Sequence, residues 1–533
     1  MASDLFIRTE DIRQEEVLSY LVETRTDREL INSLKGRSPI ILKGSRGVGK
    51  SFLMRAAEAE LQKSFHAERV LPVYVTFAKA GLIRANTPDK FMLWMMSKIC
   101  NATVRAASTY GLALPEGSAI AAIQGGGAIG GISQMERVEQ ALEDSWRTAT
   151  GSEAQGDAIV PESDTLRDAV EDLCRHANLK RICLFVDEAA HVFIPGQQRQ
   201  FFTLMRDLRS PFLSVKAAVY PGATSYGESF QPLHDATALS VDRVITESDY
   251  ASNMRLVVFK QDPSLREAIE QNGEVFDSLA YAATGNPRTL LQTMRRVTKF
   301  NRRNVQDVIR EYYREEIWSE HSSLTERYPG HQELIDWGRN FIENNVLSTL
   351  YSRNRRDKGE KTSFLWVHRD APHAVREALR LLSYSGILQE GVSGVKGTRS
   401  QIGTRYMVNL GCLCSLDSEP VSFGKEVRAA LSVKRFAEYG PNHPAFQPLD
   451  DFALPGSESE GNQALDAQLQ RSIGKLDLTE FQLKSLSGLG FKTIGEVLSA
   501  DEKDFMQAHY VGPIRSRKMR NSAMAAVFEY LSG

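Results

Sequence analysis

Residues 44–51 read GSRGVGKS, and their types and spacing suit the binding of a phosphate group. The glycines let the backbone turn its N–H groups inward, Lys50 can reach the β- and γ-phosphates of a nucleotide, and the hydroxyl of Ser51 suits Mg²⁺. The apolar run at 39–43 predicts a buried strand before this segment, and residues 52–61 are strong helix formers. We therefore predict a phosphate-binding loop whose contacts come from Gly44, Ser45, Arg46, Gly47, Val48, Gly49, Lys50, Ser51 and Phe52.

An acidic pair follows a second apolar run. Residues 181–186 read RICLFV and predict a buried strand that ends in Asp187 and Glu188. An acidic residue at the carboxyl end of such a strand can hold Mg²⁺ through water, and an adjacent glutamate can deprotonate an attacking water. Ser51 and Asp187 are therefore the candidate metal ligands, and Glu188 is the candidate base. The alternative is an acidic pair that simply begins a loop.

Two later segments contain further candidates for phosphate contact. Thr224 follows a predicted strand at 213–220 and could touch the γ-phosphate, although a turn residue is an equal alternative. Asn286 and Pro287 predict a helix start, which places Arg288 in the first turn. A cation is poorly placed there unless it has an anionic partner such as a nucleotide phosphate, so the alternative is a surface arginine on a helical lid.

The order of the predicted elements indicates the fold class. Strands expected at 39–43, 71–77, 181–186, 213–220 and 239–245 alternate with helices, which predicts an α/β fold with a parallel sheet covered on both faces. From residue 262 to 319 the pattern is wholly helical. The Gly- and Ala-rich stretch at 119–132 predicts a mobile insertion.

These motifs together resemble a known class of proteins. GSRGVGKS, the strand that ends in Asp187 and Glu188, and the helical segment that opens with GNPR resemble P-loop ATPases of the AAA+ and STAND type, and the layout of residues 20–410 looks like that of origin-recognition-type ATPases. The resemblance implies ATP as the nucleotide, a Walker A motif at 44–51, a Walker B motif at Asp187 and Glu188, and a lid sensor at Arg288. It also implies an arginine that enters the site of a neighbouring subunit, for which Arg206 and Arg209 are candidates, and hence a homo-oligomer.

The same resemblance implies a division of the chain. We expect a P-loop NTPase core with a parallel sheet, an α-helical lid, a winged-helix domain, a linker and a small all-α domain that resembles helix-hairpin-helix modules. The corresponding residues are 1–260, 261–325, 326–440, 441–470 and 471–533.

Basic residues cluster in both of the last two domains, which makes DNA a predicted partner. The expected wing at 391–403 contains Lys396 and Arg399, and an earlier loop contains Arg353, Arg355, Arg356, Lys358 and Lys361. The second of two predicted hairpins, at 510–518, contains Arg515, Arg517 and Lys518, and Arg520 follows it. Tyr510 stands where such a hairpin usually has its first glycine. Such cations can neutralise DNA phosphates. The alternatives are a winged helix that only packs on the core and a C-terminal domain that docks on protein.

Composition limits the remaining possibilities. The formal net charge of −2 excludes a uniformly basic nucleic-acid binder. No apolar run approaches the ~18 residues that cross a bilayer, and the first residues lack a signal-peptide core, so we expect no membrane partner and a cytoplasmic location. We hypothesise an ATP- and Mg²⁺-dependent switch that engages DNA. The alternative is a STAND-type signalling ATPase that recruits a partner protein.

Overall fold

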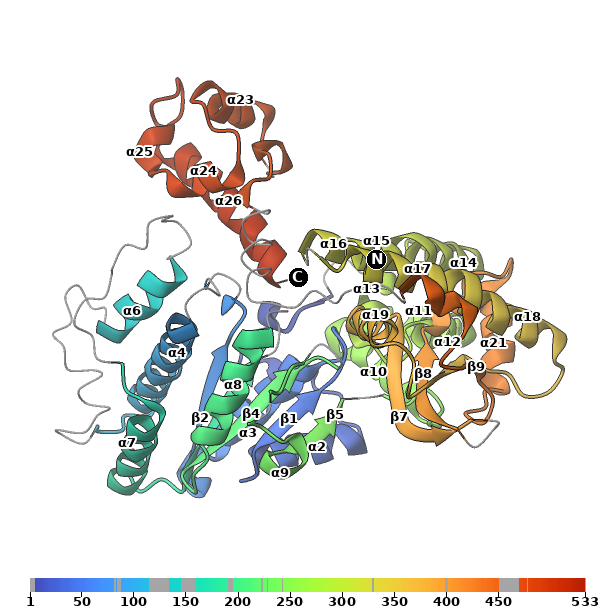
Figure 1. Cartoon of the computed structure of the whole chain (residues 1–533), viewed down its shortest axis with the longest axis horizontal. Coiled ribbons are helices and arrows are strands. Elements are labelled where there is room, and N and C mark those ends of the chain that lie inside the picture. Colours follow the sequence, from blue (N-terminus) through green and yellow to red (C-terminus); the bar gives the residue numbers. More distant parts are fainter. Residues whose placement is uncertain are drawn as a thin grey trace.

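The structure is a computed structural model of the chain (Figure 1). It describes residues 5–80, 83, 88–114, 134–144, 160–189, 195–221, 224–227, 229–241, 243–327, 330–397, 401–449, 469–476 and 478–532. The insertion expected at 119–132, Arg399 and most of the expected linker lie outside the described residues.

A five-stranded parallel sheet forms the first half of the molecule, as expected for an α/β P-loop NTPase core. The strands are β1 (Ile40–Lys43), β2 (Val70–Thr76), β3 (Arg181–Asp187), β4 (Leu213–Val219) and β5 (Thr237–Ser240), in the spatial order β2-β3-β4-β1-β5. Every pair in this sheet is parallel, so the carboxyl ends of all strands meet at one edge. The ends of β1 and β3, which lead into the glycine-rich loop and into Glu188, therefore lie at this edge with β4 between them.

The fifth strand differs from its predicted position. It was expected at 239–245, but β5 ends at Ser240. The chain then leaves the sheet, and the side chain of Arg243 turns back to donate to the carbonyl of Val48. The strand is therefore shorter than predicted, and Arg243 contacts the glycine-rich loop instead of extending the sheet.

Helices cover both faces of the sheet (Figure 1). On one face, α2 (Arg25–Lys35) and α3 (Lys50–Glu68) share a core with Ile40, Leu42 and Phe185. On the other face, α4 (Pro88–Thr109), α7 (Ser163–His176) and α8 (Pro195–Asp207) share a core with Ile41 and Leu184. Successive strand residues thus point to opposite layers, as a pleated strand requires. The helix α6 (Gln134–Glu143) packs against α4.

The residues from α10 to Leu449 form one packed unit with a continuous hydrophobic core. Helices α10 (Tyr250–Gln261), α12 (Gly273–Ala282), α13 (Pro287–Arg296) and α14 (Arg302–Glu311) contribute to the same hydrophobic cluster as residues up to Leu449. The amide of Leu410 donates to Oγ1 of Thr284 at 2.8 Å, and this hydrogen bond joins the segment after α12 to the segment after the second hairpin strand. The expected lid and the segment after it therefore share their apolar core.

A second, smaller sheet lies in this unit, with the order β7-β8-β6-β9. A long helix, α17 (Gln332–Asn340), continues through a π-helical stretch into α18 (Ser348–Arg356). The strand β6 (Phe364–His368), the helix α19 (His373–Tyr384) and the hairpin of β7 (Leu388–Lys396) and β8 (Ile402–Val408) follow, and then α21 (Pro420–Ala429) and β9 (Ala437–Tyr439). The expected winged helix included the helices corresponding to α17–α18 and α19 and the hairpin, whereas β6, α21 and β9 were not expected.

The packed unit continues past residue 440, where a linker was expected to begin. Residues 444–449 form a 3₁₀ helix in which Phe446 and Leu449 are buried. The indole of Trp337 donates to the carbonyl of Ala445 at 2.9 Å. The burial of these two side chains and this hydrogen bond attach the segment to the packed unit.

A small all-α unit ends the chain. It contains α23 (Glu480–Gly488), α24 (Ile494–Ser499), α25 (Glu502–Phe505) and α26 (Pro513–Ser532). Its core, which includes Leu486, Val497 and Phe505, is built from residues of this unit alone. Thr479 and Thr493 begin α23 and α24 with capping boxes, which satisfy the first backbone N–H groups of each helix.

A buried histidine gives this fold a predicted dependence on pH. His321 is fully buried in α15 (Ile317–Ser322), its Nδ1 lies 2.9 Å from Oγ of Ser385, and burial lowers its pKa to about 4, with a smaller contribution from the charge of Arg339. The unfolded chain takes up this proton near pH 6.5, so acid favours unfolding. The stabilisation is complete above pH 6.5 and is lost as the pH falls towards 4.

We therefore expect the free energy of unfolding of wild type to drop by about 2 kcal/mol more than that of His321→Gln between pH 7 and pH 5. Urea denaturation at the two pH values measures this difference. The same pH dependence in both proteins would contradict the assignment, because the other titrating groups are common to them.

Candidate nucleotide-binding site

The glycine-rich loop joins β1 to α3, and its geometry requires glycine at two positions. Gly47 and Gly49 have φ angles of 86° and 102°, in the left-handed region that other residues rarely adopt. A Cβ on Gly47 would lie 2.6 Å from Oδ1 of Asn286 and 2.8 Å from Cβ of Arg288. The loop therefore has the conformation of a phosphate cradle, and the start of α13 lies directly against it.

Lys50 is the first residue of α3 and is buried at the base of the loop. Its ammonium donates to the carbonyls of Gly44 at 2.6 Å and Ser45 at 3.1 Å, and lies 4.0 Å from the centre of the Tyr220 ring. Burial lowers the pKa of Lys50 to about 7, although the charges of Asp187 and Glu188 act in the opposite direction. A bound phosphate would supply the anionic partner that this cation lacks.

The acidic pair lies at the end of β3, on the same side of the sheet as the loop. Asp187 is buried, and its carboxylate accepts from the hydroxyl of Tyr74 at 2.6 Å and from the amide of Glu188 at 2.9 Å. Glu188 has a φ of 55°, a strained value for this residue type. Burial, together with the charges of Asp187 and Glu10, raises the pKa of Glu188 to about 8. Its Oε2 atom is buried and has no hydrogen-bond partner among the described residues.

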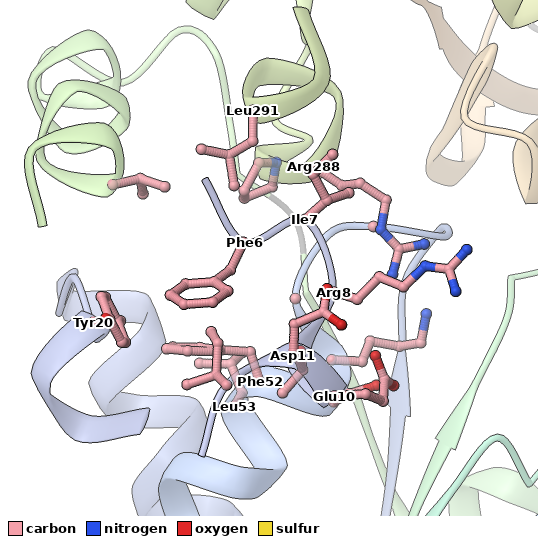
Figure 2. Close-up of a pocket in the computed structure, with 18 of the residues that line it drawn as sticks. Phe6, Ile7, Arg8, Glu10, Asp11, Tyr20, Phe52, Leu53, Arg288 and Leu291 are labelled. Atoms are coloured by element: carbon pink, nitrogen blue, oxygen red, sulfur yellow. The ribbon is translucent and has the colours of Figure 1, made fainter. Parts of the chain in front are cut away.

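A cavity of about 340 Å³ brings these groups together. Figure 2 shows an apolar end formed by Phe6, Tyr20, Phe52 and Leu53, and the chain crossing towards Arg8 and Glu10 at the other end. The charged end is also lined by Arg46, Lys50, Ser51, Glu188 and Arg288. Apolar lining with a few convergent charged groups is typical of a ligand site, and here it suits a base at one end and phosphates at the other.

A second cavity of about 250 Å³ shares Ser51, Thr9 and Glu10 with the first. Asp187 and Tyr74 also line it. Hydroxyl and carboxylate oxygens are the ligands that Mg²⁺ prefers, so the donor set of Ser51 and Asp187 fits this ion. Among the described residues, no three His, Cys, Asp or Glu side chains come together as a metal-binding group.

The start of α13 contacts the glycine-rich loop and contributes Arg288 to the cavity. The amide group of Asn286 donates to the carbonyl of Arg46 at 2.8 Å, and the backbone N–H of Arg288 donates to the carbonyl of Gly47 at 3.3 Å. The side chain of Arg288 extends into the cavity, and its Nε is buried with no hydrogen-bond partner in the described part of the chain. Burial and the nearby charge of Arg46 lower the pKa of Arg288. An anion in the cavity would stabilise the charged form of Arg288 and so offset both the burial and the repulsion from Arg46.

Sequence reasoning did not identify three residues that shape this site. Tyr220 follows β4, lines the cavity and faces Lys50. Tyr74, in β2, orients Asp187 through its hydroxyl. Arg243 donates to the carbonyl of Val48 at 2.5 Å and to the buried carboxylate of Asp27 at 3.3 Å, and so links the loop to α2. The only sequence signal for Tyr220 and Tyr74 was their position near the carboxyl ends of expected strands.

Other predicted site residues lie outside the two cavities. The hydroxyl of Thr224 donates to the carbonyl of Tyr220 at 2.8 Å, and Thr224 lines neither cavity. Arg206 donates to the carbonyl of Ser229 at 2.9 Å, and Arg209 lies 3.9 Å from the carboxylate of Asp235. Both arginines are exposed near the end of α8. The structure thus leaves them on the surface of this chain, and their role in a neighbouring subunit stays a prediction.

The basic loop expected to contact DNA is largely engaged within the protein. Arg353 donates to the carbonyl of Phe436, Arg355 pairs with the buried carboxylate of Asp417, and Lys361 is buried with its ammonium on the carbonyls of Asn354 and Asp357. Arg353 and Arg355 nonetheless remain exposed, as do Arg356 and Lys358 and, in the hairpin, Lys396. Of the five cations in this loop, Lys361 is therefore withdrawn from the surface, and the contacts of Arg353 and Arg355 compete with any contact to DNA.

The C-terminal unit exposes both basic and apolar side chains. Arg515, Arg517 and Lys518 are exposed on α26, whereas Arg520 is half-buried. Tyr510 has a φ of 61°, in the left-handed region that favours glycine, and is 75% exposed. Ile514 is 88% exposed. This end of the unit can therefore contact either a polyanion or a protein.

No family model and no curated protein matches the sequence. Among solved structures, the chain is similar to the Walker-type ATPase paby2304 of Pyrococcus abyssi, with 15% identity, a TM-score of 0.37, and coverage of 80% of this chain and 100% of that one. It is also similar to the Aeropyrum pernix ORC1 protein, solved in complex with DNA, with 16% identity, a TM-score of 0.31, and coverage of 77% and 97%. The P-loop fold of this chain is evident from its own parallel sheet and from the loop between β1 and α3. No helix in the described part of the chain has the length and apolar character of a membrane span.

Proposed function

We propose that this protein is a Mg²⁺-dependent ATPase that acts as a molecular switch and engages DNA. One observation carries the ATPase part: Lys50, Ser51 and Glu188 line a single cavity, and Asp187 lines an adjoining cavity that shares Ser51. Phosphate-binding loop, metal ligands and base are the parts that phosphoryl transfer needs, and they must lie around one triphosphate. Their convergence from two segments far apart in the chain, the glycine-rich loop and the end of β3, supports hydrolysis over simple nucleotide storage.

Each residue of the site has a separate role in the proposed reaction. Lys50 and the N–H groups of the loop bind the β- and γ-phosphates, and Arg288 and Arg46 neutralise further negative charge. Ser51 and Asp187 would hold Mg²⁺, which offsets charge on the β- and γ-phosphate oxygens when bound. Glu188 orients a water towards the γ-phosphate and accepts its proton. Tyr74 holds the carboxylate of Asp187 in place by donating to its Oδ2, and a carboxylate fixed in this way would suit a metal ligand.

We propose that α10 to α15 form the lid and that α17–α18, β6, α19 and the β7–β8 hairpin form a winged-helix domain. The order of helix, strand, helix and hairpin supports the second assignment. Because this unit shares its core with the lid, a movement of the lid would carry the wing with it. Hydrolysis would then reposition the DNA-contacting surfaces. Exposed Arg206 and Arg209 are compatible with assembly of a homo-oligomer through the α8 end of the core.

DNA contact is assigned to the C-terminal unit together with the wing, and it gives a testable prediction. We expect duplex DNA binding by the full chain to weaken steeply with salt, and Arg517→Ala combined with Lys518→Ala to lower the slope of log K against log salt by about 2, since each lost phosphate contact removes about 0.9. Fluorescence anisotropy at several salt concentrations measures the slope. Lys503→Ala, an exposed lysine of the same unit, serves as the control.

A second candidate function rests on the same unit. The exposed Tyr510 and Ile514 and the internal pairing of the basic loop favour a signalling ATPase that recruits a partner protein. Salt-insensitive or undetectable DNA binding by wild type, together with nucleotide-dependent self-association, would favour this function over the first. The ATPase site is common to both.

A further inference from the structure

A segment before the first helix crosses the cavity between the lid and the core. Residues 5–12, which we call the N-terminal strap, are held at their start by the lid. Leu5 is buried in the core of the lid, its carbonyl accepts from Arg295 of α13, and the backbone N–H of Phe6 donates to Gln261 of α10 at 2.8 Å. The strap therefore moves with the lid at this end.

The other end of the strap is attached to the P-loop helix. After a 3₁₀ turn at Thr9–Asp11, the side chain of Gln14 donates to the carbonyl of Arg55 at 3.2 Å and to the carboxylate of Glu58 at 3.0 Å. Both acceptors belong to α3, the helix that begins at Lys50. The strap thus bridges lid and core directly over the cavity, and a ligand in the cavity must contact it.

The side chains of the strap match the two ends of the cavity (Figure 2). Phe6 lies at the apolar end, with its ring centre 5.5 Å from that of Tyr20. Arg8 and Glu10 lie at the charged end. The charge of Arg8 contributes, after burial and Arg46, to the lowered pKa of Arg288, and the charge of Glu10 contributes to the raised pKa of Glu188. Both strap residues are therefore near the groups assigned to phosphate binding and hydrolysis.

Cations gather at the charged end of the cavity. Arg8, Arg46, Lys50 and Arg288 line it together with Glu10, Asp11 and Glu188, and Arg46 is already paired with Glu320 at 3.7 Å. The side chain of Arg8 has no hydrogen bond or ion pair with the described residues, and Nε of Arg288 is buried without one. Converging guanidinium groups repel one another unless an anion lies between them, and a triphosphate is such an anion.

We propose that Arg8 is a phosphate-binding residue supplied by the same chain, and that the N-terminal strap is ordered by the triphosphate and couples it to the lid. This inference rests on the proposed ATPase function. In this arrangement the chain itself provides the additional arginine that Arg206 or Arg209 was expected to provide from a neighbour. Because Leu5 and Phe6 belong to the lid, phosphate contact by Arg8 draws the lid towards the core.

The test uses the full chain and a non-hydrolysable ATP analogue with Mg²⁺. We expect Arg8→Ala to weaken binding of the analogue by about 10-fold to 100-fold, the usual loss for one hydrogen-bonded charge on an anion. Arg8→Lys should retain part of the affinity. Arg13→Ala should bind as wild type, because Arg13 is an exposed arginine next to the strap that lines neither cavity.

Hydrogen exchange supplies a second readout that a merely structural role would not change. Saturating analogue should slow exchange of residues 5–14 in wild type and in Arg13→Ala, and much less in Arg8→Ala. Wild-type affinity and protection in Arg8→Ala would overturn the inference and leave the ATPase proposal intact. Failure of the wild-type protein to bind the analogue would instead overturn the ATPase proposal. Arg8 is exposed, so equal melting temperatures should show that the variants are folded.

Discussion

Lys50→Ala is expected to lower the affinity of the protein for ATP by at least about 100-fold. Lys50 is buried at the base of the loop, and its ammonium donates to the carbonyls of Gly44 and Ser45 and lies over the ring of Tyr220. Hydrogen bonds from a buried cation to phosphate oxygens contribute about 3 kcal/mol or more, which corresponds to roughly that loss of affinity. Anisotropy of a fluorescent ATP analogue or titration calorimetry measures it.

The fold should survive this substitution, because it removes a buried charge instead of creating one. Circular dichroism and a melting temperature near that of wild type check this point. Lys63→Ala is the matched control, since Lys63 is an exposed lysine of the same helix and lines neither cavity. Equal ATP affinity in Lys50→Ala and wild type would show that the loop does not hold the triphosphate.

Glu188→Gln is expected to bind ATP with nearly wild-type affinity and to lose turnover by a factor of about 10² to 10⁴. Burial and the charges of Asp187 and Glu10 raise the pKa of Glu188, which makes its carboxylate a stronger base for the proton of the attacking water. Glutamine has nearly the same shape but cannot accept this proton. The variant therefore separates binding from chemistry, which phosphate release and analogue binding measure independently.

Glu15→Gln, at an exposed position outside both cavities, is the control for the change of residue type. If Glu188→Gln hydrolyses ATP at the wild-type rate, Glu188 is not the base. A loss of binding in Glu188→Gln would point to a role of this side chain in holding the nucleotide. Together, Lys50→Ala and Glu188→Gln show whether each residue acts in the binding of ATP or in its hydrolysis.

The sequence was sufficient wherever a feature depends on residues adjacent along the chain. The strand, the glycine-rich loop and the helix that begins at Lys50 are contiguous, so their chemistry is visible in their spacing. The runs of apolar residues in β3 and β4 are buried along their whole length, which made both strands predictable. Because parallel strands end at one edge of a sheet, the nearness of Asp187 to the loop also followed from the pattern.

Features that depend on distant segments could not be read in this way. Sequence reasoning placed the γ-phosphate contact after β4 on Thr224, whereas Tyr220 is the residue that turns into the cavity and meets Lys50. The direction of a side chain after a strand end is set by what packs around it. Tyr220 is held there by Tyr384 of α19, whose ring centre lies 4.9 Å away.

The availability of charged side chains is the clearest case of tertiary control. Arg353, Arg355 and Lys361 look alike in the sequence, yet folding brings to them the carbonyl of Phe436, the carboxylate of Asp417 and the carbonyls of Asn354 and Asp357. Arg8 and Arg288, in contrast, are brought to an open cavity with little to neutralise them. Residue spacing along the chain encodes local conformation. The partners of a charged side chain, in contrast, come from packing between segments far apart in the sequence. The contribution of that side chain to ligand binding is therefore determined only in the folded molecule.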